Sequence, residues 1–136
     1  MAKKHHIGAL ILRLFLGVTF FIHGLAKVQG GLSNTVGFFE SIGIPGFMAY
    51  IVTFIELIGG IAMIVGLGTR IISILFALIM IGAIGTVKFQ AGFMGTGQAS
   101  GYEFDLALLV ISIHLMIVNR SMFALDHVLF RSKQDD

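Results

Sequence analysis

The feature that most constrains this chain is a series of four long apolar segments. They extend over about residues 7–28, 47–67, 71–89 and 102–118. A helix needs roughly 20 mainly apolar residues to cross the hydrocarbon core of a bilayer, and each segment is close to that length. Because the bilayer core offers no water to backbone polar groups, such segments form helices. The sequence therefore predicts an all-α polytopic membrane protein, a bundle of four transmembrane helices with short interfacial helices.

Composition supports this interpretation. The 136 residues are 57% apolar and only 12% charged, whereas soluble domains average roughly 45–50% apolar and about 25% charged residues. The length suits a single domain, residues 1–136. The chain has no cysteine, which excludes disulfides, thiol relays and cysteine-bound iron–sulfur clusters. A redox role would therefore need a bound cofactor, a lipid-soluble carrier or a partner protein.

The connecting segments carry turn and interface signals. "GLGTR", residues 66–70, predicts a tight turn between the second and third spans, and the Gly-rich residues 92–101 predict a flexible loop that could act as a lid. The only proline, Pro45, follows a short segment, "TVGFFESIG", that we expect to lie along the membrane interface. Residues 121–131 have apolar residues at helical spacing and predict an interfacial amphipathic helix.

Basic residues are distributed unevenly about the spans, and cytoplasmic loops usually carry the excess. If both termini lie on one side, the other side holds only Lys27 and Lys88. The side of the termini then holds the remaining seven: Lys3, Lys4, Arg13, Arg70, Arg120, Arg131 and Lys133. We therefore expect a plasma-membrane protein with both termini in the cytoplasm. The first segment is too long for a signal-peptide core and should be retained as a span.

Ionisable residues within the spans indicate a polar site. Each costs roughly 2.5–3.5 kcal/mol on insertion scales, so it usually marks function or pairing. With cytoplasmic termini, the outer ends of three spans carry polar groups at a common depth: His23, Lys27, Lys88, Tyr102 and Glu103. Glu56 lies near the middle of the second span. His23 and Lys27 are four residues apart and share one helix face.

From this convergence we predict a shared pocket in the outer half of the bundle. The candidate catalytic residues are His23, Lys27, Glu56 and Glu103. The candidate substrate-binding residues are Tyr102, Lys88 and Arg13. Structural roles remain open, because Glu56 could instead pair with Arg13 or Lys27 to hold the bundle together.

Two other features receive structural interpretations. Asp105 points away from His114 on the fourth span, and we expect it to cap the start of that helix, where a carboxylate suits the helix dipole. Small residues on the first two spans, such as Gly17, Gly24 and Gly60, predict close helix packing.

The sequence does not identify a cofactor; a quinone is one candidate, and neither a haem nor an iron–sulfur cluster is expected. A haem would need two axial histidines, but His23 and His114 differ in depth by on the order of 13 Å. The chain has no H-x-x-x-H or E-x-x-H spacing, so no metal site is predicted.

Four stretches together resemble the DoxX family. They are "RLFLGVTFFIHGLAKV" (residues 13–28), "FFESIGIP" (38–45), "ELIGGIAMIVGLGTR" (56–70) and "GYEFDLALL" (101–109). The resemblance extends from about residue 10 to residue 129. The family positions that carry over onto this chain are Arg13, His23, Lys27, Glu56, Arg70, Tyr102 and Glu103. The chain departs from the family pattern at Lys88, where many members have histidine, and at Asp105, where asparagine is frequent.

The resemblance implies a small four-helix membrane protein associated with oxidoreductase systems. Some relatives are described as subunits of quinone-linked oxidases. Others are linked to the detoxification of quinones and catechols or to oxidative stress, often beside a soluble partner enzyme. We therefore expect an oxidoreductase, or a subunit of one, that acts on or binds quinone or catechol-type molecules while a partner supplies electrons. The other expected partners are the lipid bilayer and a second copy of the chain. No nucleic acid is expected as a partner.

Two alternatives remain at this stage. The chain could be a non-catalytic anchor or assembly subunit for a soluble redox enzyme, in which case the polar residues would be structural. It could also be a small proton-coupled exporter, since four spans with one mid-membrane glutamate fit that class. The position of Glu56 in the second span and the biased basic residues argue against an exporter.

Overall fold

The computed structural model describes residues 2–88, 92–96 and 101–118. Within these residues the chain is helical, without a β-strand, which confirms the predicted all-α class. The elements are α1 (Ala2–Gln29), α2 (Leu32–Ser41), α3 (Met48–Val65), α4 (Thr69–Ala83), the π-helical segment η1 (Ile84–Lys88) and α5 (Glu103–Val118). The predicted amphipathic helix at residues 121–131 and residues 97–100 of the predicted loop lie outside the described residues.

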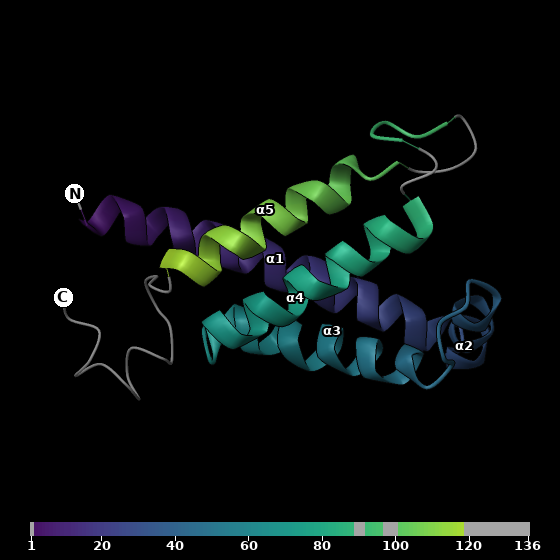
Figure 1. Cartoon of the computed structure of the whole chain (residues 1–136). Helices are drawn as coiled ribbons and strands as arrows, with labels where there is room; N and C mark the ends of the chain where they lie inside the picture. Colours follow the sequence, from purple (N-terminus) through teal and green to yellow (C-terminus); the bar gives the residue numbers. More distant parts are fainter. Residues whose placement is uncertain (1, 89–91, 97–100, 119–136) are drawn as a thin grey trace.

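The four longer helices form a bundle that α2 closes at one end (Figure 1). α1 packs along α3 and α4 packs along α5, and these two pairs make the most extensive helix contacts. α1 begins, and α5 ends, at the end of the bundle opposite α2 (Figure 1). The turn between α3 and α4 also lies at that opposite end, which leaves α2 to cover the other one.

Three of the described helices are long and apolar enough to cross a membrane: His6–Gln29, Met48–Val65 and Thr69–Thr86. They coincide with the first three predicted spans. The described α5 coincides with the fourth predicted segment, but its 16 residues extend only about 24 Å. A bilayer core is about 30 Å thick, so the structure supports three spans directly and leaves the fourth as a prediction.

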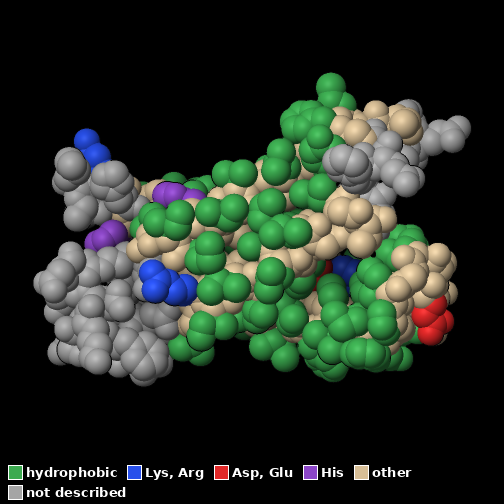
Figure 2. Space-filling view, in the orientation of Figure 1, with side chains coloured by type: hydrophobic (Ala, Val, Ile, Leu, Met, Phe, Trp, Pro, Cys, Tyr) green, Lys and Arg blue, Asp and Glu red, His purple; other side chains and the backbone are tan. Residues whose placement is uncertain are grey.

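The flanks of the bundle are covered by large apolar side chains (Figure 2). Ile58 is 63% exposed, Ile71 66% and Ile117 68%. A soluble monomer rarely exposes a continuous apolar surface of this kind, because water penalises it. The chain is therefore built to face lipid.

Glycines bring α1 and α3 into close contact. A Cβ atom added to Gly60 would lie 2.8 Å from the carbonyl oxygen of Gly17, and one added to Gly17 would lie 2.8 Å from the carbonyl oxygen of Gly60. One added to Gly24 would lie 3.1 Å from the Cβ of Glu56. The predicted close packing of the first two spans is confirmed, and it places the side chain of Glu56 beside α1.

The turn between α3 and α4 is tight, as predicted for "GLGTR". Gly66 (φ 79°) and Gly68 (φ 63°) both adopt the left-handed conformation that L side chains rarely take. After the turn, Arg70 donates from Nε to the carbonyl oxygen of Met116 at 3.1 Å, which connects the start of α4 to the end of α5. Arg13, which is buried, donates from Nη2 to the carbonyl oxygen of Ile64 near the end of α3.

The buried core fills the middle of the bundle. The rings of Phe20 and Phe76 stack with centroids 3.8 Å apart, and Gly59 leaves room for the Phe76 ring. The remaining core residues are Ala9, Leu16, Met63, Met80, Leu108 and Leu115. Between this core and α2 the helices are less completely filled, and the candidate site lies there.

Candidate functional site

A cavity of about 490 Å³ lies in the half of the bundle that faces α2. Residues from all five α-helices and from η1 line it. Its volume falls within the roughly 300–1,000 Å³ typical of small-molecule sites. Most of its wall is apolar and includes Phe20, Phe39, Met48, Ile55, Leu75 and Met80.

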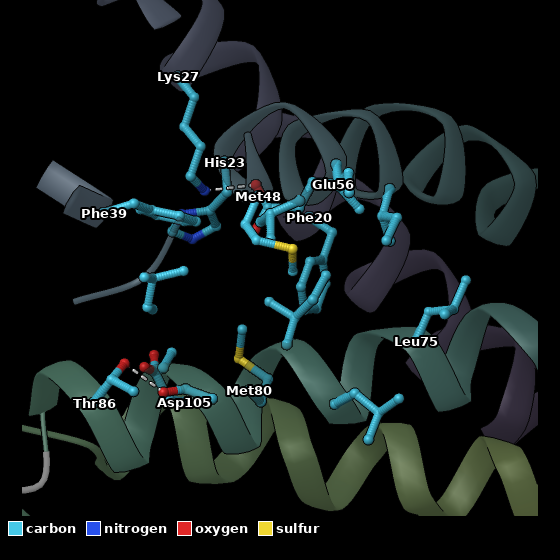
Figure 3. A pocket seen from close by; sticks show the side chains of 18 of the residues that line it. Phe20, His23, Lys27, Phe39, Met48, Glu56, Leu75, Met80, Thr86 and Asp105 are labelled. Carbon is cyan, nitrogen blue, oxygen red and sulfur yellow. Dashed lines mark hydrogen bonds and ion pairs between the residues drawn. The ribbon is translucent and has the colours of Figure 1, made fainter. Parts of the chain in front are cut away.

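An ion pair occupies one wall of the cavity. Lys27 donates from Nζ to Oε1 of Glu56 at 2.6 Å (Figure 3). The Glu56 side chain is 4% exposed and that of Lys27 is 26% exposed. The close approach of α1 and α3 at Gly24 brings the two side chains together. The sequence suggested Arg13 or Lys27 as a partner for Glu56, and the structure shows the bond to Lys27.

His23 lies one helical turn before Lys27 and lines the same cavity. Its ring centroid is 6.4 Å from that of Phe104 on α5, with the ring planes tilted by 36°. The side chain is exposed at the edge of the cavity, where its ring nitrogens can donate or accept hydrogen bonds. The predicted grouping of His23, Lys27 and Glu56 therefore has a common cavity in the structure.

The opposite wall carries a second polar group. Asp105 of α5 is 5% exposed, and Figure 3 shows it beside Thr86, across the cavity from Lys27 and Glu56. Thr86 lies in η1 and donates from its hydroxyl to the carbonyl oxygen of Gly82 at 2.6 Å. Single π-helical turns often occur at functional sites, because they redirect side chains from the regular helix spacing.

Sequence reasoning missed Asp105 as a cavity residue. It predicted a helix cap, and the residue does stand in the first turn of α5. A signal was nevertheless present, because Ser112 is seven residues later and so shares the face of Asp105. Both residues are buried, on one stripe of α5 with Leu108 and Leu115. In an otherwise apolar helix, two polar residues at that spacing indicate which face is directed into the bundle.

Four other predicted site residues are not brought to this cavity by the described structure. Tyr102 packs edge-on against Phe93, with ring centroids 5.6 Å apart. Glu103 is exposed, and neither Tyr102 nor Glu103 lines the cavity. Arg13 lies outside the lining as well, and the side chain of Lys88 lies outside the described part of the chain.

The cavity reaches the lipid-facing flank of the bundle. Among its lining residues, Leu78 on α4 is 60% exposed, Phe38 on α2 47% and Ile51 on α3 42%. Figure 2 shows a hollow on this flank near α2, with basic and acidic side chains visible inside it. A molecule dissolved in the bilayer could therefore approach the polar groups from the side.

The described residues offer hydrogen-bonding groups rather than a metal centre. No group of three or more His, Cys, Asp or Glu side chains among them could hold a metal ion. His23 lines the cavity, whereas His114 is exposed on α5 outside its lining, so these two histidines do not face one site. What the cavity presents to an organic ligand is an apolar body with polar groups on two walls.

Known proteins place this chain among small membrane proteins. Residues 8–101 match the family model of DoxX. The chain is 50% identical over 135 residues to a Bacillus subtilis protein named "Putative oxidoreductase CatD", with 99% of this chain and 96% of that protein covered. The "Uncharacterized membrane protein Rv3486" of Mycobacterium tuberculosis is 31% identical over 125 residues, covering 85% of this chain and 77% of that protein.

A shorter match is found in Escherichia coli. Its "Inner membrane protein YqjF" is 34% identical over 70 residues, which cover 52% of this chain and 53% of that protein. No solved structure matches the chain.

Proposed function

Because the chain belongs to the DoxX family, as its motifs predicted, we propose that it is the membrane component of an oxidoreductase system and binds a quinone or catechol-type molecule. The ligand occupies the cavity between α1 and α5, and a partner protein supplies the electrons. The observation that carries the proposal is the apolar cavity with His23, Lys27 and Glu56 on one wall. The physiological role is detoxification of such molecules under oxidative stress.

The chemistry of a quinone suits this cavity. A quinone needs an apolar slot for its ring and hydrogen-bond donors for its carbonyl oxygens. The ammonium of Lys27 has three N–H donors, and the one directed at Glu56 leaves others for a ligand. Reduction of a quinone consumes two electrons and two protons. His23 and Glu56 can pass protons to the ligand, whereas the electrons must come from a reduced redox protein, since the chain has no cysteine to bind a cluster.

The lateral opening suits a ligand that is dissolved in lipid. Quinones with apolar tails partition into the bilayer, and Leu78 and Ile51 flank the opening with exposed apolar side chains. The tail would remain among the lipids while the ring enters the cavity. This arrangement supports a membrane-dissolved ligand over a water-soluble one.

The proposed setting is the plasma membrane, with four spans and both termini in the cytoplasm. The basic residues Lys4 and Arg70 stand near the end of the bundle opposite α2, which agrees with the positive-inside rule. The cavity then lies in the outer half of the membrane.

Ligand binding by matched histidine variants tests the proposal. The purified chain in lipid nanodiscs should bind 2-decyl-1,4-benzoquinone, and His23→Ala should weaken binding about fivefold to tenfold, the value of one hydrogen bond. His114→Ala is the control, since His114 is exposed outside the cavity lining and should keep the affinity of the unmodified chain.

Cells provide the second arm of this test. Strains that carry His23→Ala or Glu56→Gln, with the protein at normal levels in the membrane, should lose resistance to added quinone. Unchanged binding and unchanged resistance in both variants would refute the proposal and favour a non-catalytic anchor for a soluble redox enzyme.

A further inference from the structure

α2 borders both the cavity and its lateral opening. Phe38, Phe39 and Ile42 of this helix line the cavity, and Figure 3 shows Phe39 extending from α2 into it. Phe38 is 47% exposed and lies at the lateral opening, as do Leu78 of α4 and Ile51 of α3. The position of α2 therefore sets the width of the opening through which a ligand would enter.

α2 is held to the bundle by few contacts. None of its residues is buried, whereas α3 and α4 each bury several. Among the described residues, the polar side chains of α2 make only local hydrogen bonds. Asn34 donates to the carbonyl oxygen of Gly30 at 2.7 Å, and Ser41 donates to that of Phe38 at 2.6 Å. A segment with few buried contacts opens at a low free-energy cost, so α2 can move while the bundle stays folded.

A glycine with positive φ stands at each end of α2. Gly31, immediately before the helix, has a φ of 95°, and Gly43, two residues after it, has a φ of 87°. Glycine adopts several backbone conformations at little cost, so these two positions can absorb a rotation of the helix between them. A Cβ atom added to Gly43 would meet no packed neighbour within 4 Å, so packing does not fix the chain there.

We propose that α2 is a lid over the cavity, which swings about Gly31 and Gly43 to admit a ligand from the bilayer and closes on it with Phe38 and Phe39. The inference rests on the proposed function and adds a moving element to the same site. The two phenyl rings, with centroids 6.4 Å apart, give the lid an aromatic pair that can pack against a planar ring. Such a lid governs the rates of binding and release, because the open state is only the passage between the free and the bound protein.

A disulfide across the Gly43 hinge tests the motion, and the chain has no cysteine of its own to interfere. A Cβ atom added to Gly46 would lie 2.7 Å from Cγ1 of Val36, so side chains at these two positions are within the reach of a disulfide. Neither residue lines the cavity. The double variant Val36→Cys with Gly46→Cys, oxidised in lipid nanodiscs, ties α2 to the residues that lead into α3 and holds the lid closed.

The measured quantity is the exchange of bound 2-decyl-1,4-benzoquinone. Nanodiscs loaded with tritiated probe are mixed with an excess of unlabelled probe, and the remaining label is counted over time, with empty nanodiscs as the lipid background. The oxidised double variant should bind and release the probe about tenfold more slowly than the unmodified chain, while its affinity changes by less than about threefold. The reduced double variant, freed of reductant under anaerobic conditions, and the two single-cysteine variants are the controls and should exchange at the unmodified rate.

A distance measurement tests the lid without a disulfide. Spin labels at Ser33→Cys on α2 and Ile58→Cys on α3 occupy exposed positions. Their distance distribution should be broad in the ligand-free chain and should narrow when the benzoquinone is added, because the lid then closes on the ring. Val18→Cys on α1 with Ile58→Cys is the matched control. Its distribution should not change, since α1 and α3 are closely packed.

The outcomes separate the lid from the proposed function. If the unmodified chain does not bind the probe, the proposed function fails, and the lid fails with it. If the probe binds but the oxidised double variant exchanges it as fast as the controls do, the lid is overturned while quinone binding stands. The same conclusion follows if the distances between Ser33→Cys and Ile58→Cys are identical with and without the probe. The ligand would then enter between α3 and α4 past a fixed α2.

Discussion

At the scale of single residues, Lys27 and Glu56 connect the stability of the bundle to its candidate site. The bond between them is part-buried and joins α1 to α3, with the Glu56 side chain in the interior. Breaking a buried ion pair by removing one partner typically costs about 3–5 kcal/mol, because the other charge is left uncompensated. Replacing both partners with apolar residues of similar size is often neutral. We therefore expect the fold to survive replacement of both partners.

We predict that Lys27→Met lowers the free energy of unfolding by about 3 kcal/mol, because it leaves the Glu56 carboxylate unpaired in the interior. The double variant Lys27→Met with Glu56→Met should recover most of this loss. The measurement is reversible unfolding in mixed detergent micelles for the unmodified chain, both single variants and the double variant. Lys4→Met controls for loss of an exposed positive charge.

The same set of variants separates structure from function. A stable double variant that no longer binds the benzoquinone probe is the result expected if the pair serves the ligand. Additive losses in the double variant would contradict the prediction, since they would mean that Lys27 and Glu56 contribute independently.

At the scale of helices, the α1–α3 interface depends on the absence of side chains. We predict that Gly60→Ala destabilises the fold by about 1–3 kcal/mol, because the new Cβ would lie 2.8 Å from the backbone at Gly17 and Phe21 and would force the helices apart. Gly8→Ala is the control, since open space surrounds that position in α1. It should be neutral or stabilising by up to about 1 kcal/mol.

Unfolding of both glycine variants in the same detergent gives the comparison. Since Gly24 lies on the same helix face as Gly17, a shift of α1 should also lengthen the distance between Lys27 and Glu56. Equal stabilities for Gly60→Ala and Gly8→Ala would contradict the close contact between the two backbones.

The helices themselves could largely be predicted from the sequence. The second predicted span, residues 47–67, corresponds to α3 at Met48–Val65, and residues 66–70 form the predicted turn. The length of the apolar segment determines the helix, and the ability of glycine to adopt positive φ determines the turn. The π-helical segment η1 could not be predicted, because an added residue in a helical turn leaves no pattern in an apolar run.

The candidate site was predictable only in part. His23 and Lys27 share a face because they are four residues apart, and Glu56 is the only acidic residue within the second span. The inward face of α5 had only one sequence signal, the seven-residue spacing of Asp105 and Ser112, since the helix is otherwise apolar on nearly all sides. The estimate of depth from the helical rise put Glu103 level with the cavity. Glu103 is two residues, or about 200° of rotation, from Asp105, so its side chain faces outward.

At the scale of the whole molecule, the direction of the chain across the membrane decides where the cavity opens. α1 begins at the end of the bundle opposite α2, and the cavity lies toward α2 (Figure 1). In the orientation that we propose from the basic residues, the beginning of α1 is cytoplasmic. The side of α2, with the cavity, would then face the exterior.

Single cysteines test this orientation and the number of spans together, because the chain has no cysteine of its own. We predict that Lys4→Cys and Gln134→Cys react with a membrane-impermeant maleimide only after the cytoplasmic side is opened, whereas Ser33→Cys at the start of α2 reacts in intact cells. A permeant maleimide should label all three and serves as the control. If α5 did not cross the membrane, three spans would place Gln134→Cys on the side of Ser33→Cys. Labelling of Lys4→Cys in intact cells would instead invert the whole molecule and put the cavity in the cytoplasmic half, where a soluble electron donor could reach it directly.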